Sequence, residues 1–320
     1  MNVLLCALLN QNSCKHQLTL QATDVLFEFG LIMCDTRFLI QSQPLNKEAQ
    51  ETAKKELRET PEQIQESVAK LKELLKGKPE LFFREDEEIL KIFLRPCKYY
   101  PESALALMER VADFKVKYAN VIGKLMPDDE KKIMLEQNVV NVLVDRDQDG
   151  RRILLAHEGA LWNTKEVSGD QLFRLFYLVH VLAMMEPETQ VRGVVVILDF
   201  EGLSMKQVAQ LTPSFSLRLL SFIQDAMPIR LKEVHIVKQP FIFNIVWKVF
   251  QPFVKEKLKA RLHFHGSDQK SLHKFMNPEF LPENYGGKKP KINYTSKEWY
   301  PAIKSVESRI AEWNSWGWKK

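Results

Sequence analysis

The stretch that decides the fold is GVVVILDF, residues 193–200. Five aliphatic residues follow one another between Gly193 and Asp199, so a strand here would be apolar on both faces. Such a strand must be covered on both faces, which is typical of a parallel sheet. Along the chain we expect helices over 171–186 and 214–226, and further strands over 234–237 and 262–264. This alternation predicts an α/β fold with crossover helices.

A β-hairpin is expected just before this region. Two strand-like runs, Val139–Val144 and Arg152–Ala156, are joined by DRDQDG at 145–150, whose Asp-Gly ending suits a tight turn. The aspartates of the turn also match the first half of a calcium loop. The twelfth position of such a loop needs a bidentate carboxylate, and here it is Ala156. The hairpin is therefore favoured.

The composition is that of an ordinary globular protein, with 320 residues, 45% hydrophobic, 27% charged and a net charge of +5. No apolar run reaches the ~20 residues needed to span a bilayer. The four cysteines form no closely spaced pair, which argues against a disulfide framework and favours a reducing compartment. The apolar start, Met1–Leu9, lacks the basic residues of a signal peptide. We expect a cytoplasmic protein.

The chain divides into four segments. Residues 1–44 show no clean period and are expected to be a disordered extension. Residues 45–124 should form a small all-helical domain, residues 125–295 the domain that contains the sheet, and residues 296–320, rich in tryptophan, a helical tail. Within the helical domain, caps, prolines and apolar spacing predict helices over 61–76, 86–94 and 101–118.

Candidate catalytic and metal sites are weak. His263 and His265 would share one face of a strand, but the sequence marks no further ligands, so structural histidines are favoured. Asp199 and Glu201 resemble an acid/base pair, yet an acid at the end of a buried strand is more simply a turn former or cap. No nucleotide-binding or hydrolase motif occurs. We therefore expect neither an enzyme, nor a cofactor, nor a metal site.

One expected helix, Phe241–Leu258, is apolar on nearly every side over its first part, FIFNIVWKVFQPFV at 241–254. Such a helix is either a central core helix or a lid with one face on a bound lipid and the other available to a membrane. The sequence favours the two equally. Pro252 should kink or end its first half.

Positive charge flanks this helix on both sides. The basic residues are Arg230, Lys232, Lys238, Lys255, Lys257, Lys259 and Arg261. Basic residues around an apolar helix suit docking on anionic headgroups, where each charge contributes ~1 kcal/mol. Nucleic acid is disfavoured, because the interleaved residues are aliphatic and not exposed aromatics on a basic sheet.

Short motifs that occur in a fixed order carry a resemblance to a known family. They are FLRPCKYY at 93–100, GVVVILDFEG at 193–202, QDAMPIRLK at 224–232, HIVKQP at 235–240, HFHG at 263–266 and LPENYGG at 281–287. Over residues 46–300 the chain resembles the CRAL-TRIO lipid-binding family. The resemblance implies a lipid cage between a mostly parallel sheet and a mobile helical gate, preceded by a small helical domain.

The resemblance also implies three sets of residues. The cage would be lined by Phe173, Phe176, Tyr177, His180, Val194, Leu198, Leu219, Phe222, Ile223, Met227 and Ile229. The gate would be formed by Phe241, Ile242, Ile245, Val246, Val249 and Phe253. A phosphoinositide headgroup would be bound by Arg230, Lys232, Lys257 and Arg261, while Cys97 stands where many relatives have arginine. His180 would bring a polar group into the cage, and an ordinary core histidine is equally well supported.

The function implied is that of a carrier. It would bind one hydrophobic lipid, retinoid, tocopherol-like or phospholipid, and exchange it at phosphoinositide-containing membranes, with peripheral and reversible association. The alternative is a phosphoinositide-sensing adaptor with a vestigial cage. No nucleic-acid partner is expected, and protein partners stay open.

Overall fold

The computed structural model describes residues 37–319, so the disorder expected for residues 1–44 lies largely outside the described residues. The fold centres on a sheet of five strands in the order β2-β3-β4-β5-β6. β2 (Val140–Val142) pairs antiparallel with β3 (Arg152–His157), which confirms the hairpin. The other three strands run parallel to β3, namely β4 (Val194–Asp199), β5 (Leu231–Val237) and β6 (Leu262–Gly266). The decisive stretch is thus the central strand and is parallel to both of its neighbours, which confirms the parallel strand predicted there.

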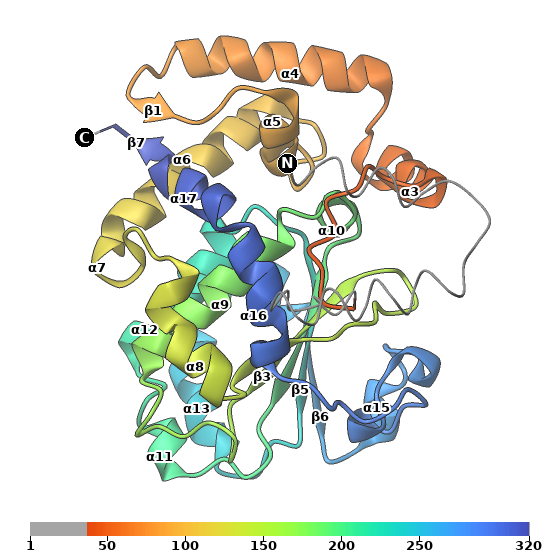
Figure 1. Cartoon of the computed structure of the whole chain (residues 1–320), viewed down its shortest axis with the longest axis vertical. Coiled ribbons are helices and arrows are strands. Elements are labelled where there is room, and N and C mark those ends of the chain that lie inside the picture. The colour runs from red at the N-terminus through yellow and green to blue at the C-terminus, as the bar shows by residue number, and fades with distance from the viewer. Residues whose placement is uncertain (1–36, 320) are drawn as a thin grey trace, which may run out of the picture. The chain divides into compact units, whose positions relative to one another are not determined.

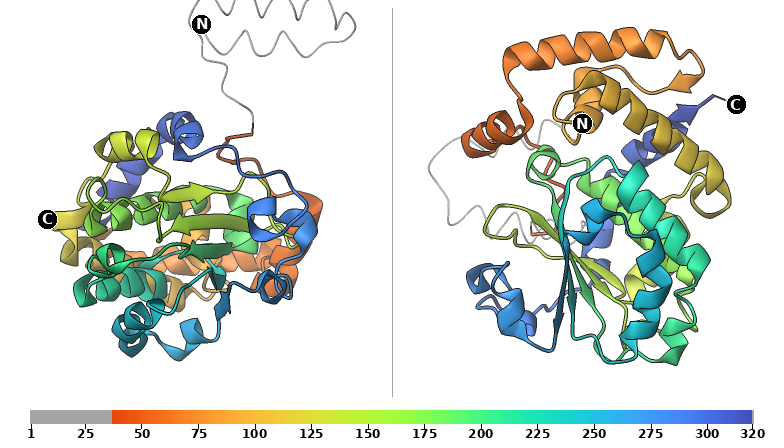
Figure 2. Two further views of the ribbon diagram at one scale, coloured as in Figure 1. Left: turned by 90° about the horizontal axis from the view of Figure 1, so that it is seen from below. Right: turned by 180° about the vertical axis from the view of Figure 1, so that it is seen from behind.

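The two faces of the sheet are covered by unequal layers (Figures 1 and 2). One face carries α9 (Gly169–Ala183), α12 (Pro213–Ser221) with the π-helical turn Phe222–Ala226, and α13 (Phe243–Phe250). The opposite face carries α15 (Gln269–Leu272) and two 3-10 turns, Pro278–Phe280 and Glu283–Tyr285. Side chains alternate between the layers: Val194 and Val196 join the larger core, and Val195 and Ile197 the smaller one.

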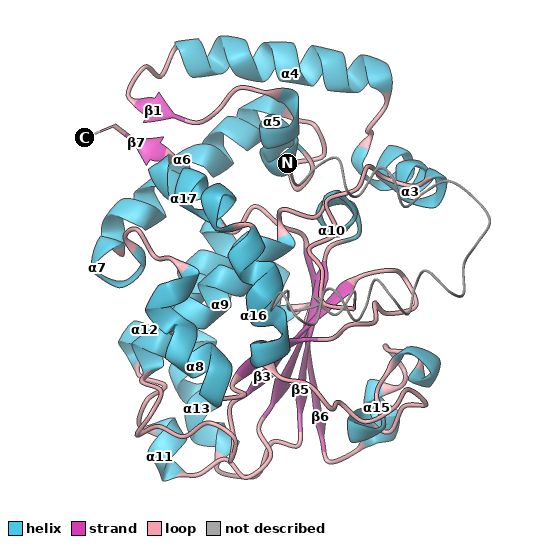
Figure 3. Ribbon diagram, in the orientation of Figure 1, coloured by secondary structure: helices cyan, strands magenta, loops and turns pink. Residues whose placement is uncertain are grey.

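Helices over residues 45–124 lie beyond the amino ends of the parallel strands (Figure 3). They are α3 (Lys47–Leu57), α4 (Pro61–Lys76), α5 (Glu87–Leu94), α6 (Pro101–Lys117) and α7 (Ala119–Ile122). The start of α4 follows from its sequence, because the Thr60 hydroxyl accepts the Gln63 N–H at 3.2 Å and proline occupies the first turn. The three helices predicted here are confirmed to within one or two residues at each end.

Shorter helices connect these parts. They are the 3-10 turn Pro127–Glu130, α8 (Lys131–Glu136), α10 (Pro187–Arg192), α11 (Met205–Val208), α14 (Glu256–Lys259), α16 (Ser296–Ser305) and α17 (Glu307–Ser315). In the hairpin turn, an Asp147 carboxylate oxygen accepts the N–H groups of Asp149 and Arg151, which uses this carboxylate structurally. The described residues contain no group of three or more His, Cys, Asp or Glu side chains placed to hold a metal ion.

The tryptophan-rich tail forms two helices and then a strand that the sequence analysis did not predict. β7 (Gly317–Trp318) pairs antiparallel with β1 (Leu81–Phe82) in the helical region. The Trp318 indole N–H donates to an Asp113 carboxylate oxygen on α6 at 2.7 Å. The tail therefore closes back on the helices of residues 45–124, and Arg37–Lys320 form one compact unit.

The helix expected over 241–258 is wrong as a single element. It is divided into α13, a 3-10 turn Gln251–Phe253 and α14. The break at Pro252 is the one expected, since proline has no backbone N–H and its ring clashes with the preceding turn of a helix.

Candidate functional site

A cavity of about 80 Å³ lies between the sheet and the helices α12, α13 and α14. The strands contribute Leu198, Ile236 and Leu262, and the α12 region contributes Leu219 and Ile223. Val246 of α13 and Leu258 of α14 close the opposite side. The site is therefore an apolar chamber whose outer wall is the broken helix.

α13 has one face on this chamber and one on solvent. Phe243 and Val246 are buried, whereas Ile245 is 45% exposed and Phe241, just before the helix, is 91% exposed. Ile242, Val249 and Phe253 are half-buried. The exposed apolar side chains fit a surface wall better than a central core helix, because a core helix would bury them.

The predicted cage residues divide into two groups. Leu198, Leu219 and Ile223 line the cavity. The others are buried in the same hydrophobic core without being part of the described lining: Phe173, Phe176, Tyr177, His180, Val194, Phe222, Met227 and Ile229.

The aromatic cluster, meaning Phe173, Phe176, Tyr177, His180 and Phe222, fills the space beside the cavity. Phe222 is its centre, with ring centroids 5.1 Å from Tyr177, 5.7 Å from His180 and 6.1 Å from Phe173. Two polar atoms of the cluster have partners within the core: the Tyr177 hydroxyl accepts the Trp313 indole N–H at 2.8 Å, and His180 Nδ1 lies 2.6 Å from the Phe176 carbonyl oxygen. The cluster packs as core.

Burial lowers the pKa of His180 to about 4, partly opposed by its bond to the Phe176 carbonyl. The unfolded chain takes up a proton on this imidazole near pH 6.5, whereas the folded protein does so only near pH 4. The free energy of unfolding should therefore fall as pH drops from about 6.5 to about 4, by at most about 3 kcal/mol from this group. Chemical denaturation of wild type and His180→Gln across this range measures the difference. Parallel pH profiles for the two proteins would contradict the assignment.

The basic cluster, meaning Arg230, Lys232, Lys257 and Arg261, lies at the amino ends of β5 and β6. Arg230 and Lys232 both bind one carboxylate oxygen of Glu56 on α3, at 2.6 and 3.3 Å. Burial and the neighbouring charge of Arg230 lower the pKa of Arg261, whose guanidinium donates to the Leu231 carbonyl. These three cations are thus brought together, while Lys257 is exposed on α14 and has no ion-pair partner among the described residues.

Sequence reasoning missed two residues of this region. Burial alone would raise the pKa of Glu56, but hydrogen bonds from Arg230 and Lys232 and their charges hold it below the usual value. Burial raises the pKa of the Cys97 thiol. The positive charges of Arg110 on α6 and of Lys257 oppose this rise in part. Arg110 therefore supplies positive charge beside Cys97. Neither contact is local in sequence, so no spacing could reveal it.

The histidine and carboxylate candidates on the opposite face of the sheet are structural. His265 lies 3.0 Å from the buried His235 and 2.9 Å from the Ser271 hydroxyl, and burial and the other two histidines lower its pKa to about 4. Asp199 accepts the Glu201 N–H at 3.0 Å and the Tyr285 hydroxyl at 3.1 Å, which is a turn-forming role.

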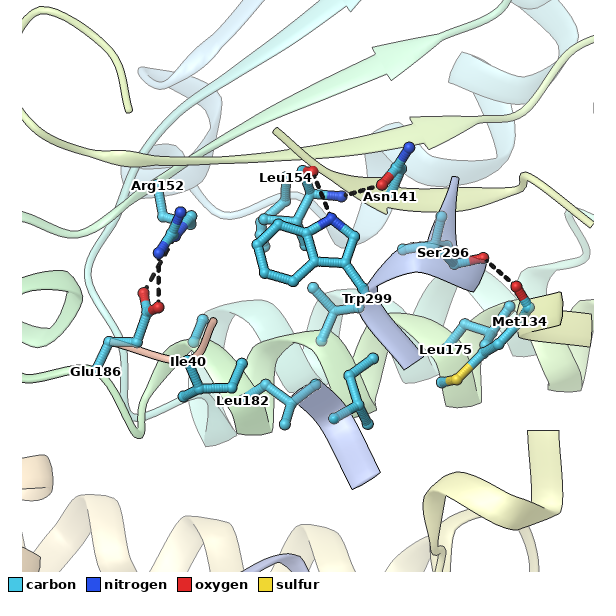
Figure 4. A pocket seen from close by; sticks show the side chains of 15 residues that line it. Ile40, Met134, Asn141, Arg152, Leu154, Leu175, Leu182, Glu186, Ser296 and Trp299 are labelled. Atoms are coloured by element: carbon cyan, nitrogen blue, oxygen red, sulfur yellow. Dashed lines mark hydrogen bonds and ion pairs between the residues drawn. The ribbon is translucent and has the colours of Figure 1, made fainter. Parts of the chain in front are cut away.

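A second, smaller cavity of about 40 Å³ lies between β2, β3, α9 and α16 (Figure 4). One end is closed by Arg152 and Glu186, which are joined by two hydrogen bonds of 2.6 and 3.1 Å. Trp299 covers the middle and donates its indole N–H to the Val142 carbonyl at 3.0 Å. Ile40 reaches this cavity from the described end of the N-terminal extension.

None of the helices in the described part of the chain combines the length and apolar character that a membrane span requires.

Comparisons with known proteins identify relatives of this chain. Residues 136–287 match the model of the CRAL/TRIO domain. Clavesin-1 of Pongo abelii is 31% identical over 248 residues, which cover 77% of this chain and 70% of the relative. Clavesin-2 of Homo sapiens is 29% identical over 248 residues, covering 77% and 76%. Among solved structures, Sfh5 aligns with a TM-score of 0.43 at 16% identity, over 62% of this chain and 72% of that one. The chain therefore belongs to the CRAL/TRIO family of lipid-binding proteins.

Proposed function

We propose that this protein is a carrier that encloses one hydrophobic lipid in the cavity behind α13 and exchanges it at phosphoinositide-containing membranes. The observation that carries the proposal is the two-sided character of α13. Its inner face, Phe243 and Val246, closes the cavity, while its outer side presents Ile245 and the neighbouring Phe241 to solvent. One element thus touches both the lipid site and a surface suited to a membrane.

The size of the cavity supports movement of this element. A cavity of about 80 Å³ is smaller than the roughly 150 Å³ apolar cavity that holds benzene. Any membrane lipid is larger still, so binding requires α13 to move outward. The break at Pro252 divides the wall into short pieces, and short pieces can shift separately more easily than one long helix.

The basic cluster supports a link between headgroup and lipid. Lys257 and Leu258 are adjacent on α14, where Lys257 faces solvent and Leu258 lines the cavity. A phosphoinositide headgroup at Lys257 and Arg261 would therefore pull on the same helix that closes the lipid site. Such coupling must be reciprocal: headgroup binding should weaken lipid retention, and bound lipid should weaken headgroup binding.

Native mass spectrometry after exposure to a cell-lipid extract tests the carrier. One stoichiometric hydrophobic adduct is expected, and its release should be faster with vesicles containing phosphatidylinositol bisphosphate than with neutral vesicles. Equal release rates would contradict the coupling. A protein that stays empty would favour the alternative, a phosphoinositide-sensing adaptor.

Glu56 should compete with the headgroup, because its carboxylate occupies Arg230 and Lys232. Glu56→Gln removes one negative charge from this surface, so vesicle affinity should rise about fivefold, which corresponds to ~1 kcal/mol per charge. Cosedimentation with bisphosphate-containing vesicles measures the change, and Glu66→Gln, an exposed position on α4, is the matched control. Unchanged affinity in Glu56→Gln would place the headgroup away from Arg230 and Lys232.

A further inference from the structure

One carboxyl group lies inside the apolar cavity. Glu158 directly follows β3, and its backbone N–H continues the sheet by donating to the Asp199 carbonyl at 2.8 Å. Leu154 and Ala156, which share its side of the strand, join the core on the cavity side, whereas Ile153 and Leu155 join the opposite core. Glu158 therefore points toward the cavity, and it is the only ionisable side chain on the described lining.

The side chain of Glu158 has no hydrogen-bond or ion-pair partner among the described residues, although the residue is only 3% exposed. Burial raises the pKa of this carboxyl to about 8, so at neutral pH the protonated form predominates. An unpaired carboxyl in an apolar wall costs folding free energy. By contrast, Glu186 and Glu130, the other strongly buried glutamates, each pair with an arginine.

We propose that Glu158 is the polar anchor of the lipid site and selects an uncharged lipid that carries a hydroxyl group. The proposal rests on the proposed carrier function and names the ligand class. A protonated carboxyl offers one O–H donor and an acceptor oxygen, and a hydroxyl can satisfy both. A hydrocarbon ligand would leave the carboxyl unpaired, and a phosphate diester would bring a full negative charge into a chamber whose lining holds no cation.

The position of Glu158 also fixes an orientation. Apart from Glu158, the described lining consists of aliphatic and aromatic side chains, which come from the sheet, α12, α13 and α14. The hydroxyl end would therefore lie at the carboxyl end of β3, and the hydrocarbon part would extend along the inner face of α13.

Matched pairs of ligands test this selection: retinol with deoxyretinol, α-tocopherol with its deoxy analogue, and hexadecanol with hexadecane. Each pair is offered in equimolar amounts to the full chain, and bound species are counted by native mass spectrometry. The wild type should favour the alcohol at least tenfold in every pair that binds, since a buried carboxyl left unpaired opposes the hydrocarbon.

Two variants separate the anchor from the cavity itself. Glu158→Gln keeps a donor and an acceptor, so it should keep the preference for the alcohol. Glu158→Leu should lose the preference and bind the hydrocarbon at least as well. This variant should also fold, because it replaces an unpaired buried acid with an apolar group and its thermal midpoint should not fall.

Equal binding of alcohol and hydrocarbon by the wild type would overturn the anchor while leaving the carrier intact. A preference for the alcohol that survives in Glu158→Leu would also overturn the anchor while leaving the carrier intact. Failure of every ligand to bind either protein would overturn both proposals together.

Discussion

Glu186→Ala is expected to lower the free energy of unfolding by about 3–5 kcal/mol, the range for breaking a buried ion pair on one side. The Glu186 carboxylate accepts two bonds from Arg152, one from Arg146 at 3.1 Å, one from the Thr189 hydroxyl at 2.6 Å and one from the Gln41 N–H at 3.0 Å. Its removal leaves Arg152, which is 3% exposed, as an uncompensated buried charge. Urea denaturation followed by circular dichroism measures the loss.

The control for this prediction is Glu66→Ala, at an exposed position on α4, which should change stability by less than about 0.5 kcal/mol. A double variant, Arg152→Met with Glu186→Leu, should recover most of the loss, because an apolar pair of similar volume avoids the desolvation of both charges. A loss below about 1 kcal/mol in Glu186→Ala would mean that water reaches this end of the second cavity.

Lys257→Gln combined with Arg261→Gln is expected to weaken binding to vesicles that contain phosphatidylinositol bisphosphate by roughly thirtyfold. Each charge near an anionic surface contributes ~1 kcal/mol, and two charges contribute about twice that. The lipid capacity measured by native mass spectrometry should stay unchanged, since neither side chain lines the cavity.

Lys297→Gln is the matched control, because Lys297 is exposed on α16, which packs against β2 at the opposite edge of the sheet from β6. The salt dependence of vesicle binding is a second test. Added salt screens exposed charges, so it should weaken vesicle binding by the wild type more than by the double variant. If lipid capacity falls in parallel with vesicle binding, the two sites are not separable.

Much of the fold could be predicted, because its signals are local. The aliphatic run at 193–200 required burial on both faces, and the Asp-Gly turn required a hairpin, and both are present. The single helix expected over 241–258 is wrong, but the break expected at Pro252 is confirmed, because proline lacks the backbone N–H that would continue α13. β7 is too short for any periodic pattern, and its partner lies more than two hundred residues away.

The candidate site was less predictable, because its decisive contacts are not local. Glu56 accepts a hydrogen bond from Arg230, which lies 174 residues later in the chain. Glu158 follows the end of a predicted strand, and its apolar surroundings come from neighbouring strands and helices that are distant in sequence. The aromatic residues at 173–180 were expected to line the cage, but Phe222 and Trp313 pack against them.

The pairing of β1 with β7 bears on how the protein is made. Leu81 finds its strand partner only at Trp318, and the Lys115 ammonium donates to the Trp316 carbonyl at 3.0 Å. Translation produces α4, α5 and α6 first, yet their final contacts arrive only when residues 313–318 have been synthesised. Until then the nascent chain exposes apolar surface that native folding covers, so completion of its early helical part depends on late residues.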